Sequence, residues 1–376
     1  MKRLLTYLQQ QLDGDLEFLE RMVNMDSPSF EKPLVDRFAR FVGSRFEDLG
    51  AAVDYVSGGR FGDHLRARFS GESQGRILLL GHTDTVFAAG EALKRPFKLE
   101  GGKATGPGVF DMKAGILLIL SALRGLLHAD GRLKRSVTVL LTSDEEVGSL
   151  SSRSLIETEA RQSRVVLVLE PSLPGGVLKT ARKGVGRFTI KAIGRAAHAG
   201  IDPLKGINAI EEAAHQVIEL QRMSQGDSGT TVTAAVIQGG TRPNVVPAEA
   251  AIEVDVRVST MDEAERITKR IRALEPHLPQ ARLEIHGGIN RPPMERTEDT
   301  ARLFAMASAI ASELGVDLKE GSTGGASDGN LTSALGIPTL DGLGAIGDGA
   351  HALDEFVEVA SLPYRAALLA GLIVRV

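Results

Sequence analysis

The chain has 376 residues, of which 43% are hydrophobic and 24% are charged, as is typical of a soluble globular protein with about two domains. Lys and Arg total 44 against 48 Asp and Glu, without a basic block, so the charge pattern gives no sign of nucleic-acid or anionic-membrane binding. The chain has no Cys, which excludes disulfides, thiolate nucleophiles and Cys-ligated zinc. A metal site would have to use His and carboxylate ligands.

Residues 1–25 begin with basic residues, but Gln and Asp interrupt the segment before a signal-like apolar core develops. We interpret this segment as an amphipathic helix and not as a secretion signal. No run of about 18 apolar residues is present, so we expect no membrane span. The expected setting is cytoplasmic, without a membrane or nucleic-acid partner.

Helical patterns near residues 3–24 and 32–49 are followed by an alternation of buried strands and helices. Continuous Val, Leu and Ile runs separated by helices predict an α/β fold whose sheet is covered on both faces. The strands are expected at 76–82, 136–142 and 164–170, and the helices at 111–130 and 151–160.

The pattern changes after about Lys183, where alternating, half-exposed strands appear. Their order with two amphipathic helices is β-α-β-β-α-β, which is the ferredoxin-like arrangement. Pro292 and Pro293 end this region, and the α/β style resumes from Thr297. We therefore predict one domain made of residues 1–182 and 295–376, interrupted by an inserted domain of residues 183–294.

Polar residues occur where predicted strands end. His82 and Asp84 follow the first buried strand two residues apart, so both side chains point the same way, at the edge where open α/β sheets bind ligands. A loop His beside a capping Asp explains this pair equally well. Asp111 stands at the expected N-cap of the long buried helix, and its second oxygen can face the same edge.

The stretch "TSDEEVGS", residues 142–149, follows the next strand. Ser143 and Glu146 fit a capping box, and acids suit a first helical turn. Because neighbouring residues of a turn point in different directions, Glu145 and Glu146 cannot both act as caps. Glu170 ends a further apolar strand, where either an Arg or a metal would compensate its charge.

The shared position of these residues is more informative than any one of them. Together with His351 in a late Gly-rich loop, they form the His and carboxylate set of a zinc hydrolase site. Two Zn²⁺ ions carry four positive charges, and the carboxylates of Asp111, Glu146 and Glu170 offset three of them. The remaining charge favours hydroxide binding, since zinc lowers the pKa of water to about 7.

Other signals are weaker. Residues 342–347 match GxGxxG but no helix follows them, and the Gly-rich segment 321–330 lacks the Lys of a phosphate-binding loop. The remaining histidines are expected to be structural or solvated: His64, His128, His215, His277 and His286.

In this order, the segments "GHTDTV", "GPGVFDMKAG", "TSDEEVGS", "LEPS", "AAHAG", "NVVPAEA…DVR" and "GAH" resemble those of the di-zinc exopeptidase and deacylase family. The family includes glutamate carboxypeptidase, acetylornithine deacetylase, succinyl-diaminopimelate desuccinylase and aminoacylase. The resemblance covers essentially the whole chain and is strongest to bacterial glutamate carboxypeptidase. It implies a zinc-exopeptidase-type catalytic domain with a covered mixed sheet, and an inserted ferredoxin-like domain that acts as a lid and dimerisation domain.

The resemblance also implies a ligand set for two zinc ions per subunit, with Co²⁺ or Mn²⁺ as alternatives. His82 and Glu170 would bind one ion. Glu146 and His351 would bind the other, and Asp111 would bridge the two.

The implied catalytic residues lie beside these ligands. Asp84 would orient His82, as carboxylates behind metal-binding histidines do. Glu145 would be the general base that takes a proton from water and returns it to the leaving nitrogen. His198 would polarise the scissile carbonyl from the partner subunit, which predicts a homodimer through the inserted domain.

The implied substrate-binding residues come from the inserted domain and one loop. Asn244 and Arg257 would hold the terminal carboxylate of the substrate, because an Arg fork binds a carboxylate bidentately. The backbone near Gly325 would receive the same group. Arg291 lies where the glutamate-specific relatives have an Arg near the substrate side chain.

The expected activity is hydrolysis of an amide bond beside a C-terminal amino acid, of the glutamate carboxypeptidase type, with folate-like, N-acyl-glutamate or dipeptide substrates. Within the family that the chain resembles, Glu at position 170 implies a carboxypeptidase or deacylase in preference to an aminopeptidase. The main alternative is an N-acyl-amino-acid deacylase with the same chemistry. A non-catalytic metal-binding dimer is the remote alternative.

Overall fold

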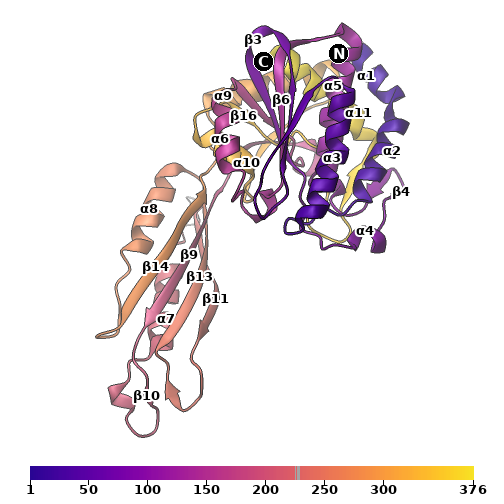
Figure 1. The fold of residues 1–376 in the computed structure, drawn as a ribbon. Coiled ribbons are helices and arrows are strands. Elements are labelled where there is room, and N and C mark those ends of the chain that lie inside the picture. Colours follow the sequence, from indigo (N-terminus) through magenta and orange to yellow (C-terminus); the bar gives the residue numbers. More distant parts are fainter. Residues whose placement is uncertain (225, 227–228) are drawn as a thin grey trace. The chain divides into compact units, whose positions relative to one another are not determined.

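The computed structural model describes residues 1–224, 226 and 229–376. The chain divides into two compact units (Figure 1). Unit 1 comprises Met1–Ala181, Arg296–Thr323 and Ser327–Val376, and unit 2 comprises Arg182–Glu295 with Gly324–Ala326. Each unit is described by itself below.

Unit 1 is built on a six-stranded sheet with the order β1-β2-β6-β3-β7-β16. Strands β3, β6, β7 and β16 are parallel, whereas β1 and β2 add antiparallel pairs at one edge. This arrangement confirms the predicted mixed α/β sheet. The strand bounds are β1 Ala52–Val56, β2 His64–Phe69, β3 Gly71–His82, β6 Leu133–Thr142, β7 Val165–Val168 and β16 Thr339–Leu340.

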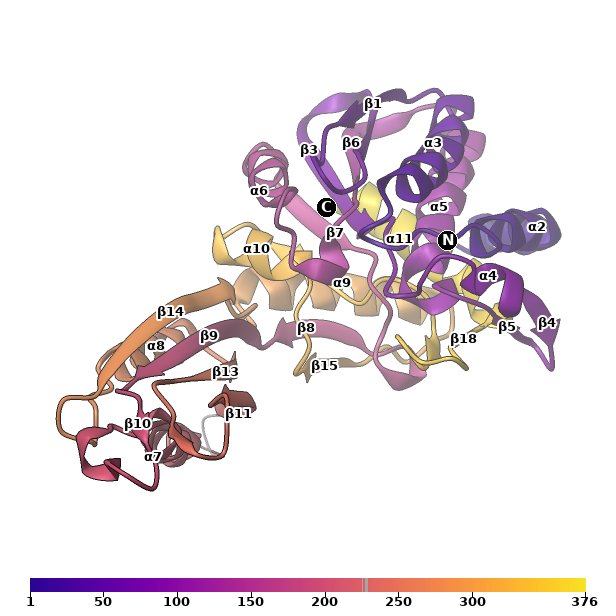
Figure 2. The same ribbon diagram turned by 60° about the horizontal axis from the view of Figure 1, so that its bottom comes forward.

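Helices cover both faces of this sheet, as Figures 1 and 2 show. Leu79 of β3 faces the larger core, to which α5 and α11 also contribute, while Leu78 and Leu80 face a second core with α6 and α10. Successive strand residues point to opposite faces, so a strand covered on both sides is apolar throughout. The helices are α1 Lys2–Gln10, α2 Leu12–Val23, α3 Lys32–Asp48, α4 Glu91–Lys94, α5 Ala114–Asp130, α6 Arg153–Arg161, α9 Glu298–Glu313, α10 Asp328–Ala334 and α11 Leu362–Arg375.

Two smaller sheets complete unit 1. One has the order β17-β18-β5-β4, and the other pairs β15 with β8. The first matters for the site, because it joins the segment after β5 to the hairpin β17–β18. The bounds are β4 Lys98–Glu100, β5 Lys103–Thr105, β8 Leu178–Arg182, β15 Glu320–Thr323, β17 Gly347–Asp348 and β18 Phe356–Glu358.

Two helix predictions need correction. The N-terminal helix is divided at Gln11 into α1 and α2. The long buried helix begins at Ala114, and its N-cap is Lys113, so Asp111 is not the cap. Asp111 lies two residues before that cap, in the segment Val109–Lys113, with extended dihedral angles (φ −114°, ψ 98°).

Unit 2 has the predicted β-α-β-β-α-β order. Its four-stranded antiparallel sheet has the order β11-β13-β9-β14, and α7 and α8 pack with alternate strand residues into one core (Figure 2). A short ribbon, β10 with β12, extends from it. The bounds are β9 Gly184–Ile193, β10 Ala197–His198, α7 Ala209–Gln221, β11 Thr231–Gly239, β12 Val245–Val246, β13 Glu249–Val258, α8 Met261–Arg272 and β14 Arg282–Arg291.

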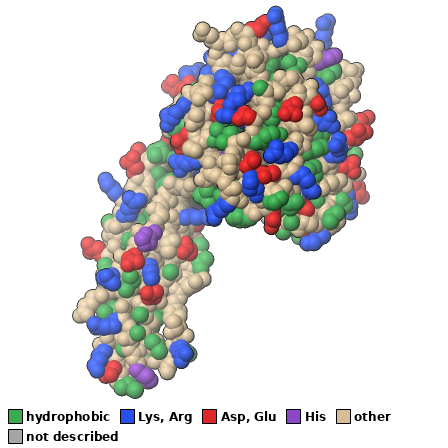
Figure 3. Space-filling model, viewed as in Figure 1, with side chains coloured by type: hydrophobic (Ala, Val, Ile, Leu, Met, Phe, Trp, Pro, Cys, Tyr) green, Lys and Arg blue, Asp and Glu red, His purple; other side chains and the backbone are tan. Residues whose placement is uncertain are grey.

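Acidic and basic side chains are interspersed on the face of the molecule shown in Figure 3. Among the residues that the structure describes, no helix combines the length and the apolar character needed to cross a membrane.

Candidate active site

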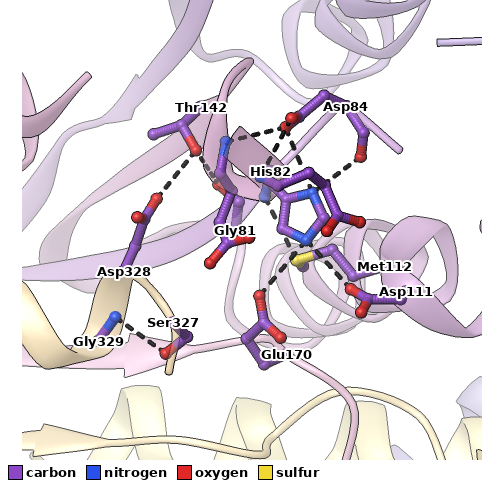
Figure 4. A network of polar contacts seen from close by, with 12 residues as sticks. Gly81, His82, Asp84, Asp111, Met112, Thr142, Glu170, Ser327, Asp328 and Gly329 are labelled. Carbon is purple, nitrogen blue, oxygen red and sulfur yellow. Dashed lines mark hydrogen bonds and ion pairs between the residues drawn. The ribbon is translucent and has the colours of Figure 1, made fainter. Parts of the chain in front are cut away.

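Parallel pairing brings the predicted polar residues of unit 1 to one edge of the sheet. His82 is the last residue of β3 and pairs with Thr142, the last residue of β6. Leu80 pairs with Val168 of β7, so the Glu170 side chain follows at the same edge. Figure 4 shows the His82 ring between Asp84 on one side and Asp111 and Glu170 on the other. Strand register therefore explains how residues far apart in sequence converge.

The two oxygens of Asp111 face two separate groups of side chains. Asp111 Oδ1 lies 3.1 Å from His82 Nε2, which is in turn 3.4 Å from Glu170 Oε1. Asp111 Oδ2 lies 3.4 Å from His351 Nε2, which is 3.1 Å from Glu146 Oε2. One carboxylate thus stands between two His and Glu pairs, which is the arrangement that a carboxylate bridging two cations requires.

Two sets of donor atoms lie close enough together to hold an ion, and neither set coincides with one of the two groups around Asp111. Donor atoms of His82, Asp111 and Glu146 lie within 4.8 Å of one another, and the same holds for His82, Glu145 and Glu170. Glu146 Oε1 is buried and has no hydrogen-bond partner among the residues that the structure describes. Since a buried unpaired carboxylate oxygen is costly, this atom fits a position facing a cation.

Asp84 is buried and holds the turn that carries both glutamates. Its Oδ1 and Oδ2 accept hydrogen bonds from the amides of Glu145 and Glu146, each at 3.2 Å. His82 Nδ1 lies 2.9 Å from the Asp84 carbonyl oxygen, which leaves Nε2 to face Asp111 and Glu170. Ser29 Oγ donates to Asp84 Oδ2 at 2.7 Å.

The predicted capping box is wrong. Residues Glu145–Val147 form a single 3₁₀ turn whose N-cap, Asp144, makes no side-chain capping bond. Ser143 Oγ instead donates to the Gly62 carbonyl and lies 2.9 Å from His64 Nδ1. Asp84, a residue distant in sequence, accepts the Glu146 amide hydrogen that Ser143 was expected to accept.

Charges in this cluster are strongly coupled. Burial by itself lowers the pKa of His82, but Asp111, Asp84 and Glu170 raise it well above its ordinary value. Hydrogen bonds to Asp111 and Glu146 raise the pKa of His351 to about 10. Burial raises the pKa of Glu146 to about 8 and also raises that of Glu170. The carboxylates of this cluster therefore favour positive charge next to them.

His351 is held by a tight hairpin loop between β17 and β18. It has a positive φ of 66°, a conformation that costs a non-Gly residue free energy, and its side chain is 52% exposed. Gly349, two residues earlier, also has a positive φ of 80°. The loop therefore presents the imidazole at the open side of the cluster.

The predicted residues of unit 2 form two local groups. His198 and Asn244 lie on neighbouring segments, because the Ala199 amide donates to the Asn244 carbonyl at 3.0 Å. The amides of Gly200 and Ile201 donate to His198 Nδ1, each at 3.1 Å. A neutral His198 with Nδ1 as acceptor carries its proton on Nε2, where it can donate to a carbonyl oxygen.

The second group contains the predicted carboxylate-binding residues. Arg257 forms a two-point ion pair with Asp255 at 2.8 and 3.0 Å, and its Nη1 donates to the Gly324 carbonyl at 3.4 Å. Gly325 directly follows Gly324, whose carbonyl oxygen Arg257 contacts. Arg291 is buried on β14, with 5% of its surface exposed.

Several residues at the site were not identified from the sequence. They include Ser29 beside Asp84, Met112 (whose Sδ accepts the His82 amide at 3.3 Å), Lys113 and Glu355. Three acids stand near His351 in the sequence, Asp348, Asp354 and Glu355, and the sequence does not distinguish the one that is buried in the fold. Ser29 left no signal either, since only the folded chain brings it to Asp84.

The chain matches the model of peptidase family M20/M25/M40 over residues 78–375. It is 31% identical over 365 residues to carboxypeptidase G2 of Pseudomonas sp. (strain RS-16), covering 95% of this chain and 88% of that protein. It is also 31% identical over 343 residues to the succinyl-diaminopimelate desuccinylase of Magnetococcus marinus, covering 84% and 87%. Aminopeptidase PepT of Bacillus cereus shares the fold, with a TM-score of 0.80, 22% identity and coverage of 96% and 98%.

The chain therefore belongs to peptidase family M20/M25/M40, as the motifs in its sequence indicated. Its class is that of the metallopeptidases and related hydrolases that act on amide bonds.

Proposed function

We propose that this protein is a carboxypeptidase of the glutamate type, which hydrolyses the amide bond beside a C-terminal amino acid with the help of two divalent cations. The observation that carries the proposal is the position of Asp111 between the two His and Glu pairs. The likeness to carboxypeptidase G2 over 95% of the chain supports this substrate class.

His82, Asp111 and Glu170 would hold one cation, and Asp111, Glu146 and His351 would hold the other. Imidazole and carboxylate donors without thiolates suit Zn²⁺, with Co²⁺ or Mn²⁺ as alternatives. When bound, such ions lower the pKa of the attacking water and polarise the scissile carbonyl. Side chains of the protein carry out the remaining tasks, which are proton transfer and substrate binding.

Glu145 is the proposed general base. Its amide is fixed by Asp84, and a carboxylate oxygen lies near both His82 and Glu170. From there Glu145 takes a proton from the attacking water and delivers it to the leaving nitrogen. Glu146, the next residue, is committed to the His351 side of the cluster, so adjacent glutamates have different roles.

The predicted site residues of unit 2 are proposed to bind the substrate. His198 donates from Nε2 to the scissile carbonyl oxygen, while Asn244, Arg257 and the backbone at Gly325 receive the terminal carboxylate. Arg257 pairs with Asp255 through Nε and Nη2, and its Nη1 contacts the Gly324 carbonyl oxygen, so the proposed role requires the substrate carboxylate to bind at Nη1 or to displace one of these partners. Contact of Arg291 with an acidic substrate side chain stays a prediction.

A homodimer is part of the proposal. Exposed apolar side chains gather on edge strand β11 and on α7 of unit 2: Val236, Ile237, Ile210 and Ile218. Both an unpaired strand edge and exposed apolar residues favour association with another chain. Sedimentation should give a dimer for the wild type and a monomer for I237E, whereas V316E on unit 1 should remain dimeric. A monomeric, fully active wild type would contradict the dimer.

The central test is E145Q. This variant should retain the wild-type metal content and lose about 10²–10⁴-fold in kcat, because an amide cannot accept the proton. The matched control E17Q changes an exposed glutamate of α2 and should be fully active. Substantial activity of metal-loaded E145Q would refute the assignment of the base.

N-acyl-amino-acid deacylase activity is the second candidate, favoured by the 31% identity to a desuccinylase. Both activities use the same chemistry and differ in the acyl group. Assaying folate-like, dipeptide and N-succinyl or N-acetyl amino acid substrates in parallel separates them, since the preferred acyl group gives the higher kcat/KM.

A further inference from the structure

Glu355 is a fully buried acid that the proposed chemistry does not use. It shows no measurable exposure, and it lies at the end of the loop that carries His351. Its Oε1 accepts the Gly108 amide and its Oε2 accepts the Phe110 amide at 3.4 Å, with a further hydrogen bond from the Asp111 backbone. One carboxylate therefore binds several amides of the turn that presents Asp111.

The backbone around Glu355 explains why this contact joins two loops. Phe356, the next residue, pairs with Thr105 across β18 and β5, and Asp348 pairs with Phe356 across β17 and β18. The Asp111 turn follows directly after β5, and His351 lies in the hairpin between β17 and β18. Strand pairing aligns the bases of both loops, and the buried Glu355 side chain reaches from one loop to the backbone of the other.

Two other contacts support the same turn. Lys113 is buried, and its Nζ donates to the Pro107 carbonyl at 3.0 Å and to the Met25 carbonyl at 2.9 Å. Gly108 has a positive φ of 73°, and a Cβ there would come within 2.6 Å of Thr85 Cγ2. The turn therefore needs a glycine and an acceptor for the amides that this conformation directs inwards.

We propose that Glu355 is a positioning residue that fixes the Asp111 turn and the His351 loop to each other, so that their ligand atoms are set before a metal binds. The inference rests on the proposed two-cation site. A carboxylate buried this completely is costly unless it is hydrogen-bonded, and the amides of the turn supply those hydrogen bonds.

E355Q is the test variant, because Gln is the same size but supplies one acceptor and turns the other position into a donor facing an amide. E358Q is the matched control, since Glu358 is three residues further along the same segment and exposed. Metal affinity is measured by titrating Co²⁺ into the metal-free protein against a chelator. E355Q should bind Co²⁺ about 10–100-fold more weakly than E358Q, as is usual when a residue that supports metal ligands is changed.

Two further readouts separate positioning from general stability. The thermal midpoint of metal-free E355Q should fall by no more than the few degrees that one lost buried hydrogen bond costs, while hydrogen exchange should be faster in segments 106–113 and 347–355 and unchanged in the rest of unit 1. Equal Co²⁺ affinity of the two variants would overturn the inference, and so would faster exchange spread over the whole of unit 1.

A measurement on the wild type keeps the inference testable if E355Q does not fold. The amides of Gly108 and Phe110 should remain protected from exchange after the metal is removed, and exchange at unfolded rates would overturn the inference. If the wild type binds no divalent metal, the proposed function itself fails, which is a separate and distinguishable result.

Discussion

Replacing Asp84 with Asn tests how the turn of adjacent glutamates is positioned. The Asp84 carboxylate accepts the Glu145 and Glu146 amides at 3.2 Å each and the Ser29 hydroxyl at 2.7 Å. Asn supplies one acceptor oxygen, so at least one amide faces an NH₂ group in either orientation. Losing one hydrogen bond to a charged group costs about 1.5–3 kcal/mol.

If this free-energy cost arises because the Glu145–Glu146 turn is held less firmly, it weakens metal binding by the same amount. The Co²⁺ affinity of D84N should then fall about 10–100-fold, because 1.4 kcal/mol corresponds to a factor of 10. The loss of one negative charge beside the cluster acts in the same direction. The assays are Co²⁺ titration against a chelator and kcat/KM of the loaded enzyme. S29A, which removes only a neutral donor to Asp84, should show a smaller effect.

D48N is the matched control, since Asp48 forms an exposed ion pair with Arg45 in which 65% of the Asp48 side chain is accessible. It should behave as the wild type does. Co²⁺ affinity of D84N within twofold of D48N would refute the view that Asp84 holds the glutamate turn.

Three further predictions concern the metal, the substrate and the stability of unit 2. Chelation should abolish hydrolysis and Zn²⁺ or Co²⁺ should restore it, and activity that is indifferent to chelators would refute the metal site. R257A should raise KM by about 10–100-fold, because the lost hydrogen bonds to the substrate carboxylate are worth about 1.5–3 kcal/mol. R270A, a control on the exposed side of α8, should leave KM unchanged. An unchanged KM for R257A would exclude Arg257 from carboxylate binding. Burial opposes ionisation of Glu212, but hydrogen bonds from the Leu278 amide, Gln216 and the His277 amide lower its pKa. The ionised form of Glu212 therefore stabilises the fold at pH values above the unfolded pKa of about 4.3, and this stabilisation is lost as the pH falls through the lower pKa of the folded state. E212Q should lower the urea midpoint at pH 7, and the midpoint of this variant should decline less than that of the wild type below about pH 4. E211Q, the control, should match the wild type. Unfolding can be followed by far-ultraviolet circular dichroism, since the chain has no Trp.

The sequence by itself predicted which His and acidic residues the fold brings together at one edge of the sheet. His82, the Glu145–Glu146 pair and Glu170 follow continuous apolar runs, and such runs are typical of strands buried on both faces. Parallel strands end at a common edge, so polar residues after them must meet. This local logic predicted the α/β sheet covered on both faces and the ferredoxin-like order of unit 2, whereas the mixed strand directions came from the family resemblance.

The tertiary structure decided how these residues are held. The sequence assigned Asp111 to a helix cap and Ser143 to a capping box, because local hydrogen bonds are what a linear pattern can predict. In the folded chain, the Glu145 and Glu146 amides are accepted by Asp84, and the turn before Asp111 is held by Glu355. The helix begins three residues later, at Ala114.

The reason for this difference is sequence separation. Ligand type and strand-end position depend on neighbouring residues, so they can be predicted from a short segment. Asp84, which accepts the Glu145 amide, is 61 positions away in the sequence, and Glu355, which accepts the Phe110 amide, is 245 positions away. Only the packed chain determines which of the many acids in the sequence reaches a given amide.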